Sequence, residues 1–308
     1  MTPESWWRRR SACAKQLLSG CFSNGMGKLE TTEPRLASAL RYVLERPGSM
    51  ARAVVAYMVG IEMGLVEESA RALSCGIEYL HTASLIFDDL PAMDDAQLRR
   101  GDECVHLVHG ESTAILAALA LVNRGYAMLW QGVALGNSER RREAAGLIDK
   151  RLGVTGVIGG QAYDLGAWAE KKDAAGVSKV AAMKTADLLR LTVVLPAILG
   201  RASRREIQLL DRLALFRGLA YQAADDLKDV FSSSSGKSGG RDELLGRPNL
   251  VACEGIHGAA NRLLRLNAIA DKIQLSLPRA YGEIRALSML RTELPSELTQ
   301  LSNIATAV

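Results

Sequence analysis

The chain has 308 residues, and its 38 Lys and Arg residues nearly balance 34 Asp and Glu residues, for a formal net charge of +4. This balance excludes a uniformly basic surface of the kind that binds nucleic acid or anionic lipid. With 48% hydrophobic and 23% charged residues, the chain has enough apolar material for a large core, so a soluble globular protein is predicted rather than a disordered or fibrous one.

The first 30 residues are predicted to form an arm or a helix, whose mobility the sequence leaves open, ahead of a single domain over residues 31–308. Basic residues at 8–10 precede a mildly apolar stretch, but Lys15 and Gln16 interrupt it, so it does not form the apolar core of a signal peptide. Five scattered cysteines without a CxxC pair predict a reducing, cytoplasmic location. No run reaches the roughly 18 apolar residues of a membrane span, so no transmembrane segment is predicted.

Apolar residues repeat at intervals of three and four along almost the whole chain, so the predicted fold is all-α. Helix starts are predicted after Pro34 and after Ser49. Further helices are predicted over 67–89, 112–135, 138–152, 155–169, 177–199 and 204–231, with amphipathic helices between 250 and 304. The Ser- and Gly-rich segment 232–248 is predicted to be a mobile loop over a site, although a linker has the same composition.

Four aspartates, Asp88, Asp89, Asp94 and Asp95, lie within eight residues directly after the apolar segment 81–87. Acidic residues near the C-terminus of a helix are disfavoured by the helix dipole, so another requirement is expected to keep them there. The alternative is that they are solvated residues of a loop.

A second acidic group, preceded by Gln222, lies inside the helix predicted over 204–231 and comprises Asp225, Asp226 and Asp229. Asp225 and Asp229 are four residues apart, and Gln222 lies three residues before Asp225, so these three share one helix face. Divalent cations are the simplest means of holding like charges together on one face. Mg²⁺ favours a few carboxylates completed by water and phosphate oxygens, so the two acidic groups predict that magnesium and a diphosphate bind together.

Basic residues support a diphosphate ligand. Arg99 and Arg100 follow the first acidic group, and Lys184 and Thr185 lie in the helix predicted over 177–199. Fixed cations stabilise the negative charge that grows on a leaving diphosphate. Singly, each of these residues would be interpreted as a surface charge, but together with both acidic groups they predict a site.

At this point the chain resembles the trans-prenyltransferases, or isoprenyl diphosphate synthases, over roughly residues 37–248. The first acidic group has the DDxxxxD form of that family, followed by Arg-Arg-Gly, and the second has the form QxxDDxxD. Three further stretches match in order and spacing, namely Gly159-Gly160-Gln161 with Asp164, Lys184-Thr185, and Gly236-Lys237. Residues 81–101 look most like bacterial geranylgeranyl diphosphate synthases. The resemblance implies an isoprenoid synthase type helical bundle around a central apolar cavity, and a homodimer.

The resemblance also implies roles for individual residues. Mg²⁺, as several ions, and the allylic diphosphate would be bound by Asp88, Asp89, Asp94, Asp225, Asp226 and Asp229. The allylic diphosphate would also be held by Arg99, Lys184, Lys237 and Arg247, with Thr185 and Gln222 near the developing carbocation; at Arg247 the family usually has Lys. Isopentenyl diphosphate would be held by Arg52, His81 and Arg100. For His81 the alternative is a core histidine whose hydrogen bonds are satisfied.

One segment departs from the family pattern. The family's Gly-Lys-Arg-x-Arg-Pro segment corresponds to residues 48–53, where Ser49 replaces the Lys, Met50 the next Arg and Ala53 the Pro. Losing one charge-assisted contact would weaken binding of the acceptor diphosphate by about tenfold to a hundredfold unless another group compensates. Arg41 and Arg46 are candidates for that compensation.

The implied reaction is condensation of isopentenyl diphosphate with an allylic diphosphate, geranyl or farnesyl, through Mg-assisted ionisation. The residues four and five positions before the first Asp are Ser84 and Ala83, which would form the floor that limits chain length. Because both are small, geranylgeranyl diphosphate is the predicted product. The alternative is that they merely permit close helix packing.

Two other functions are compatible with parts of the sequence. A class I terpene synthase on the same fold would use a single prenyl diphosphate, and Ser49 and Met50 favour it, but its second metal motif is missing. A non-catalytic partner subunit of another synthase would have no need for both acidic groups.

Overall fold

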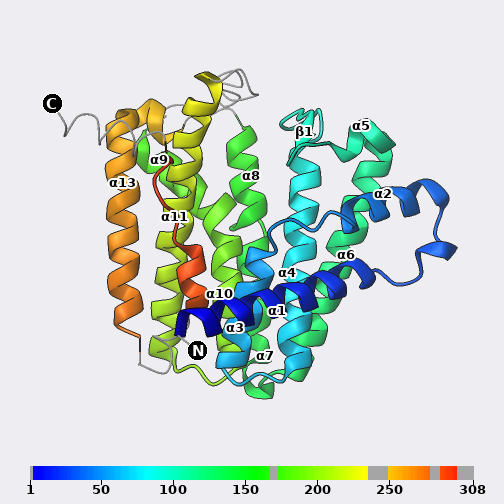
Figure 1. Cartoon of the computed structure of the whole chain (residues 1–308), viewed down its shortest axis with the longest axis horizontal. Coiled ribbons are helices and arrows are strands. Elements are labelled where there is room, and N and C mark those ends of the chain that lie inside the picture. Colours follow the sequence, from blue (N-terminus) through cyan, green and yellow to red (C-terminus); the bar gives the residue numbers. More distant parts are fainter. Residues whose placement is uncertain (1–2, 167–172, 235–248, 278–284, 297–308) are drawn as a thin grey trace. The chain divides into compact units, whose positions relative to one another are not determined.

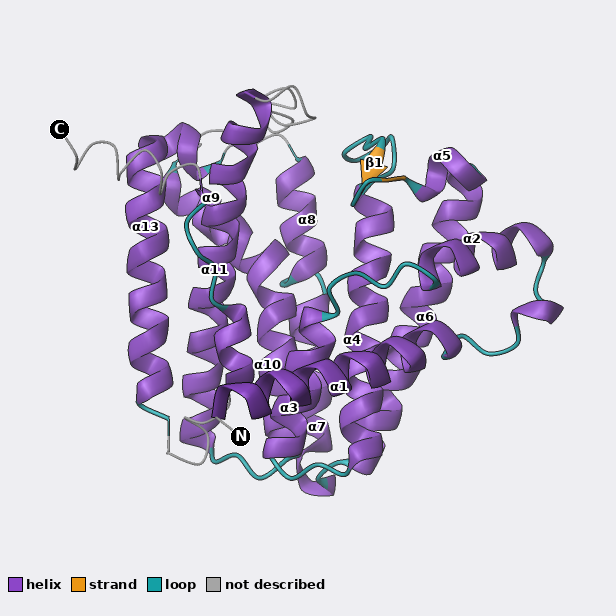
Figure 2. Cartoon of the chain, in the orientation of Figure 1, coloured by secondary structure: helices purple, strands orange, loops and turns teal. Residues whose placement is uncertain are grey.

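The computed structural model describes residues 3–166, 173–234, 249–277 and 285–296. Within these ranges helices dominate, and the extended elements are the two-residue strands β1 (Leu98–Arg99) and β2 (Asp102–Glu103), which pair antiparallel (Figure 2). The prediction of an all-α fold is confirmed.

The chain divides into two compact units. Unit 1 comprises Met1–Ala144 and Pro196–Arg201, and unit 2 comprises Ala145–Leu195 and Ala202–Val308. The first acidic group therefore belongs to unit 1 and the second to unit 2. A single domain over residues 31–308 stays a prediction.

Unit 1 is built on the packing of two long helices. Its helices are α1 (Pro3–Asn24), η1 (Leu29–Thr31), α2 (Pro34–Leu44), α3 (Ala51–Glu62), α4 (Glu67–Asp88), α5 (Val105–His109) and α6 (Glu111–Leu135). Helix α4 packs along α6 and against α3, and Figure 1 shows α4 beside α6. Glycines allow the close approach, because a Cβ on Gly76 would lie 2.9 Å from the backbone oxygen of Gly125, and one on Gly132 would lie 2.6 Å from the Leu73 side chain.

Residues 1–30, predicted as an arm or a helix, contain the docked helix α1. Its side chains Leu18 and Phe22 are buried, and the Phe22 ring stacks on Tyr79 of α4 with 4.8 Å between the ring centroids. The Tyr79 hydroxyl donates a hydrogen bond of 2.6 Å to the Phe22 carbonyl oxygen. Burial of these two apolar side chains fixes the C-terminal half of α1 on unit 1.

Unit 2 packs helices around a small apolar core. Its described elements are α8 (Val157–Leu165), α9 (Ala174–Ala181), the π-helical segment η3 (Ala182–Ala186), α10 (Asp187–Leu199), α11 (Arg204–Ser234), α13 (Leu250–Leu275) and η4 (Arg285–Leu290), with η2 (Ser138–Arg140) and α7 (Arg141–Leu152) leading in from unit 1. Figure 1 shows α11 and α13 side by side, and their buried residues, among them Ala220, Leu227 and Leu263, form one cluster.

Two predicted helices of unit 2 differ from the structure. The segment 177–199, predicted as one helix, is continuous but changes to π-helical hydrogen bonding over Ala182–Ala186. Of the segment 155–169, the described part is helical over Val157–Leu165 and leaves the helix at Gly166 in an extended conformation, and residues 167–169 lie outside the described residues. Both differences lie beside residues that the sequence analysis assigned to the site.

Helix α6 is long and apolar enough, by length and composition alone, to cross a membrane. Within unit 1 its buried face packs on α4. The absence of a transmembrane segment stays a prediction.

Candidate active site

The first acidic group folds back on the end of α4. Asp88 is the last residue of that helix, and the Asp94 N–H donates a hydrogen bond of 2.9 Å to the Asp88 carbonyl oxygen. Asp95, at the tip, adopts a left-handed conformation with φ 47°, which aspartate tolerates better than most residues. The hydrogen bond from Asp94 to Asp88 holds the backbones of these two predicted magnesium ligands next to each other.

Asp89 and Arg99, two predicted site residues, pair with each other. Asp89 is only 3% exposed, and Arg99 Nε donates to its Oδ1 over 3.0 Å while Arg99 Nη2 contacts the same oxygen. Burial would lower the pKa of Arg99, but the hydrogen bond and charge of Asp89 outweigh it and raise that pKa. The buried Asp89 therefore stabilises the charged form of Arg99.

The three residues predicted to hold isopentenyl diphosphate come together in unit 1. Arg52 Nη1 lies 3.0 Å from His81 Nε2, and the charges of Arg52, Arg100 and Arg99 add to burial in pushing the pKa of His81 well below its usual value. His81 is therefore neutral at physiological pH, with Nε2 accepting from Arg52. Such a cluster concentrates positive charge on guanidinium groups, which bind phosphate oxygens in pairs.

Glycine at position 48 makes room for this cluster. A Cβ on Gly48 would lie 1.9 Å from Arg100 Nη1, so the Arg100 guanidinium packs directly on the backbone there. Arg100 itself has a left-handed backbone with φ 59°. Although residues 49, 50 and 53 depart from the family pattern, Gly48 keeps its contact with the Arg100 guanidinium.

Glu78 belongs to this cluster, and sequence reasoning missed it. Its side chain is buried, and burial raises its pKa against the opposing charges of Arg52 and Arg100. The signal in the sequence was an acidic residue inside an apolar helix, three residues before His81 and hence on the same side.

Lys184 lies in the π-helical segment η3 of unit 2. Its Nζ is 2.5 Å from Oδ2 of Asp164, which comes from α8. Single-turn π-helices commonly mark functional sites, because the extra residue redirects the side chains next to it. Asp164 entered the sequence analysis only through the resemblance, and the structure makes it the partner of Lys184.

Helix α8 reaches η3 because of two glycines. A Cβ on Gly159 would lie 3.0 Å from the end of the Met183 side chain, and a Cβ on Gly160 would lie 2.3 Å from the backbone nitrogen of Lys184. Helix α8 and η3 are therefore in backbone contact, which sets Asp164 opposite Lys184. This contact gives a physical reason for the Gly159-Gly160 pair.

Replacing Gly160 by alanine is expected to lower the free energy of unfolding by about 1–3 kcal/mol, because the new methyl group meets backbone atoms that cannot rotate away. Urea unfolding, read by circular dichroism, measures the change. Gly146→Ala is the matched control: a Cβ there has no atom within 4 Å, so inside α7 this substitution should stabilise by about 0.5–1 kcal/mol. A Gly160→Ala protein as stable as the wild type would show that α8 and η3 do not pack this closely.

A chain of hydrogen bonds joins three helices of unit 2. Thr185 Oγ1 donates to Gln222 Oε1 over 2.7 Å, and Gln222 Nε2 donates to Asp226 Oδ1 over 2.8 Å. The other Asp226 oxygen accepts from the backbone N–H of Leu250 over 2.8 Å. Thr185 and Gln222, both predicted to act near the carbocation, are thus fixed relative to each other.

The second acidic group divides between two faces of α11. Asp226 is 2% exposed and is engaged by Gln222 and Leu250, whereas Asp225 is exposed and Asp229 half-buried. Asp225 and Asp229 are one helical turn apart and share a face. Asp225 and Asp229 therefore have carboxylates that are less occupied by buried contacts than that of Asp226, and the role of all three as magnesium ligands stays a prediction.

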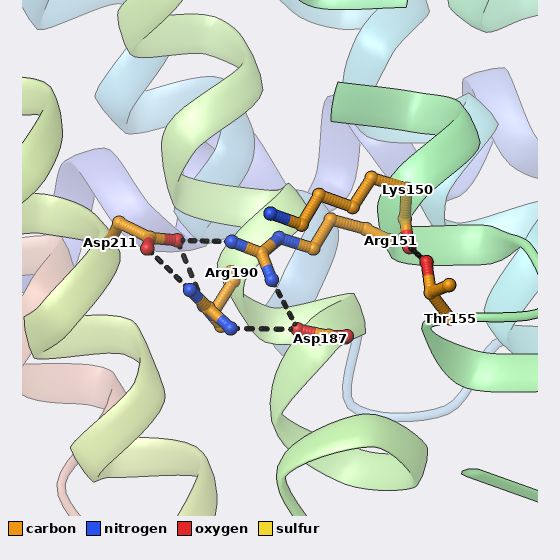
Figure 3. A network of polar contacts seen from close by, with 6 residues as sticks. All are labelled: Lys150, Arg151, Thr155, Asp187, Arg190 and Asp211. Atoms are coloured by element: carbon orange, nitrogen blue, oxygen red, sulfur yellow. Dashed lines mark hydrogen bonds and ion pairs between the residues drawn. The ribbon is translucent and has the colours of Figure 1, made fainter. Parts of the chain in front are cut away.

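An ion-pair network anchors α10 directly after η3 (Figure 3). Arg151 of α7 donates to Asp187 over 2.8 Å and to Asp211 over 3.0 Å. Arg190 donates to Asp187 over 3.0 Å and to Asp211 over 2.8 Å. Two cations and two anions balance in a largely buried setting. No motif in the sequence indicates that these four residues meet.

The predicted chain-length floor divides between two environments. Ala83 is buried, and it lies two turns after Gly76 on the face of α4 that packs on α6. Ser84 is half-buried, and its hydroxyl donates to the His81 carbonyl oxygen over 2.8 Å. Close helix packing therefore accounts for Ala83, and Ser84 is the stronger candidate for the floor.

A cavity of about 300 Å³ in unit 1 is not the predicted substrate cavity. It lies between α1, α4 and α6, and its lining includes the polar or charged residues Asn24, Glu68, Arg71, Arg124 and Gln131 and none of the predicted site residues. The central apolar cavity stays a prediction.

The acidic residues fit magnesium by the chemistry of their donors. They offer hard carboxylate oxygens, and in the part of the chain that the structure describes no three His, Cys, Asp or Glu side chains form a preassembled cage. Mg²⁺ needs no such cage, because water and substrate phosphate oxygens complete its octahedron. Lys237 and Arg247, predicted to hold the allylic diphosphate, lie outside the described residues.

Comparisons with known proteins agree with this chemistry. A family model described as polyprenyl synthetase matches residues 33–277. Geranylgeranyl pyrophosphate synthase 9, chloroplastic, of Arabidopsis thaliana is 34% identical over 239 residues, covering 75% of this chain and 66% of that protein. Geranylfarnesyl diphosphate synthase of Leucosceptrum canum is 34% identical over 249 residues, covering 77% of this chain and 68% of that protein. The chain thus spans about two thirds of the length of these curated relatives.

Solved structures share the fold. A geranyltransferase from Helicobacter pylori, complexed with magnesium and isoprenyl diphosphate, superposes with a TM-score of 0.78 at 25% identity, covering 98% of both chains. A synthase titled FPP/GFPP synthase from Zymomonas mobilis superposes with a TM-score of 0.77 at 24% identity, covering 93% of this chain and 98% of that one. The second likeness concerns the fold alone.

Proposed function

The chain belongs to the polyprenyl synthetase family, and from that premise we propose that it is a trans-prenyltransferase. It condenses isopentenyl diphosphate with an allylic diphosphate, geranyl or farnesyl, to give geranylgeranyl diphosphate. The observation that carries the proposal is the meeting of Arg52, His81 and Arg100 in unit 1. A synthase with two substrates needs a second diphosphate site of this kind, and a cyclase with one substrate does not.

In this reaction the allylic C–O bond breaks, and its electron pair leaves with the diphosphate. The isopentenyl double bond then forms the new C–C bond to the allylic carbon, and the proton lost from the isopentenyl unit goes to the departing diphosphate. Bound magnesium supplies charge neutralisation of the diphosphate. Arg99 and Lys184, each held by an acidic partner, take up the growing negative charge.

The other residues of the site position and protect the reacting groups. His81 and the guanidinium of Arg52, which are hydrogen-bonded to each other, hold the acceptor diphosphate. The hydrogen-bonded pair Thr185 and Gln222 offers fixed dipoles on the allylic side. Carboxylates of each acidic group, foremost Asp88, Asp94, Asp225 and Asp229, would hold magnesium.

We also propose a homodimer in the cytoplasm. All five cysteines are free, as expected for a reducing compartment.

The proposed dimer is supported by an apolar surface on α6. The side chains Ile115, Leu116 and Leu119 are exposed, and Leu119 follows the other two by four and three residues, so the three share a helix face. A second copy of the chain would cover them.

The test is an assay of purified protein with Mg²⁺ and geranyl or farnesyl diphosphate, with and without isopentenyl diphosphate, with products read by mass spectrometry. The proposal expects a twenty-carbon diphosphate that forms only when isopentenyl diphosphate is present. A hydrocarbon or alcohol formed from the allylic substrate alone would decide for a terpene synthase, which Ser49 and Met50 favour. No turnover of either kind would leave the partner subunit as the better interpretation.

A further inference from the structure

We propose that the polar cavity of unit 1 is a binding site for a small multivalent oxyanion of the phosphate class, separate from the diphosphate sites of the proposed reaction. The cavity has a volume of about 300 Å³ and lies between α1, α4 and α6. Two arginines line it, Arg71 from α4 and Arg124 from α6. The inference goes beyond the proposed function, because binding of this anion requires neither substrate.

The two guanidinium groups of the cavity have no acceptor from the protein. In the part of the chain that the structure describes, neither Arg71 nor Arg124 forms an ion pair or a hydrogen bond, and Nε of Arg124 is buried without an acceptor. A buried donor that lacks an acceptor is destabilising, and a guanidinium binds phosphate oxygens through two parallel hydrogen bonds. An oxyanion in the cavity would supply the missing acceptors.

One carboxylate lies at the rim of the cavity. Glu68 is exposed, and its Oε1 accepts a hydrogen bond of 3.4 Å from Gln131 Nε2 of α6. Glu68 precedes Arg71 by three residues, a spacing at which ion pairs form on helices, but within the described residues these two form none. Two cations against one anion leave the lining with a net positive charge.

The wall that α1 contributes is held in place. Cys21, Asn24 and Gly25 line the cavity, and a Cβ on Gly25 would collide with the Tyr79 hydroxyl of α4. The stacking of Phe22 on Tyr79 holds the same end of α1. The cavity is therefore preformed, and the exposed Asn24 at its rim leaves it accessible from solvent.

The cavity is distant from the predicted substrate sites. Arg71 lies ten residues before His81 and seventeen before Asp88 on α4, which corresponds to about 15 Å and about 25 Å along a helix. On α6, Arg124 lies nearly opposite Ile115 and Leu119. The cavity therefore does not belong to the apolar surface that the proposed dimer would cover.

The test uses Cys21, which lines the cavity, as a reporter in the wild-type protein without magnesium or prenyl substrates. Alkylation by N-ethylmaleimide, an uncharged reagent, is followed at each cysteine by peptide mass spectrometry, with inorganic diphosphate as the probe. For a Kd of about 1 mM, diphosphate at about 5 mM should slow alkylation of Cys21 about sixfold, because protection follows 1 + [L]/Kd. Cys13 is exposed on the same helix outside the cavity and should keep its rate.

Three variants locate the bound anion. Arg71→Gln and Arg124→Gln should each raise the diphosphate concentration needed for protection about tenfold to a hundredfold, since each removes one charge-assisted contact. Arg142→Gln removes an exposed cation of α7 outside the cavity and should leave protection unchanged. Each rate is compared with that of the same variant without diphosphate, so a general loosening of the variant does not count as lost protection.

A parallel series with geranyl diphosphate distinguishes a free anion from a prenyl headgroup. Ala72 and Met128 are the buried apolar residues of the lining, so a prenyl tail finds little apolar surface there, and the free anion should protect at least as well. Stronger protection by geranyl diphosphate would overturn the assignment to a free anion.

Three other results would overturn the inference. The first is an unchanged Cys21 rate with diphosphate, and the second is equal protection by sodium chloride at the same ionic strength, which would reduce the effect to screening. The third is protection that survives in Arg71→Gln and Arg124→Gln but is lost in Arg52→Gln, which would place the anion in the acceptor site. Because alkylation is read without turnover, none of these results depends on the proposed function.

Discussion

Replacing Lys184 by alanine is expected to lower kcat by roughly a hundredfold to a thousandfold, the effect of removing one preorganised charge that stabilises a developing anion. Lys184 projects from the π-helical segment η3, and its ion pair with Asp164 holds the ammonium group in a half-buried place. There its charge needs little reorganisation when the diphosphate leaves. The measurement is steady-state turnover of both substrates at saturating Mg²⁺.

Lys179→Ala is the matched control for this prediction. Lys179 lies five residues earlier, is exposed, and contacts the Tyr163 ring rather than an acid. Its removal should leave kcat within about twofold, because an exposed cation is screened by solvent. Equal losses from the two lysines, or no loss from Lys184→Ala, would contradict a role for Lys184 in stabilising the leaving group.

The helices were predictable where a long periodic pattern governed them. The helices predicted over 67–89 and 112–135 are found as Glu67–Asp88 and Glu111–Leu135, because one apolar stripe runs through each. The π-helical segment at Ala182–Ala186 was not predictable, since an extra residue in a helical turn leaves the apolar pattern almost unchanged. The π-helical segment contacts α8, and the spacing of apolar residues within one helix does not predict contacts with another helix.

The sequence was sufficient to name most residues of the site, but not to predict which of them contact one another. Both acidic groups and Lys184 could be named, because charged residues inside apolar helices are conspicuous. Their mutual contacts could not be predicted: Asp89 with Arg99 is a pairing across a turn, and Asp164 with Lys184 joins two helices. Glu78 was overlooked because a single acidic residue inside an apolar helix forms no motif.

Loss of the Asp187 carboxylate is expected to have the largest effect on stability. Asp187→Ala should lower the free energy of unfolding by about 3–5 kcal/mol, the cost of breaking a buried ion pair from one side. Asp187 is 4% exposed and accepts from Arg151 and Arg190, so its removal leaves two guanidinium groups with Asp211 as their shared anion in this network (Figure 3). Urea unfolding at pH 7 measures the loss.

Two variants separate this electrostatic effect from a packing effect. Asp149→Ala removes an exposed acid of α7 and should change stability by less than about 0.5 kcal/mol. Adding Arg151→Met to Asp187→Ala should restore part of the lost stability, because the second substitution removes a buried charge that the first left uncompensated. If the double variant is less stable than Asp187→Ala by the full cost of Arg151→Met alone, the two residues act independently. In that case the network is a set of separate contacts and does not anchor α10 as a unit.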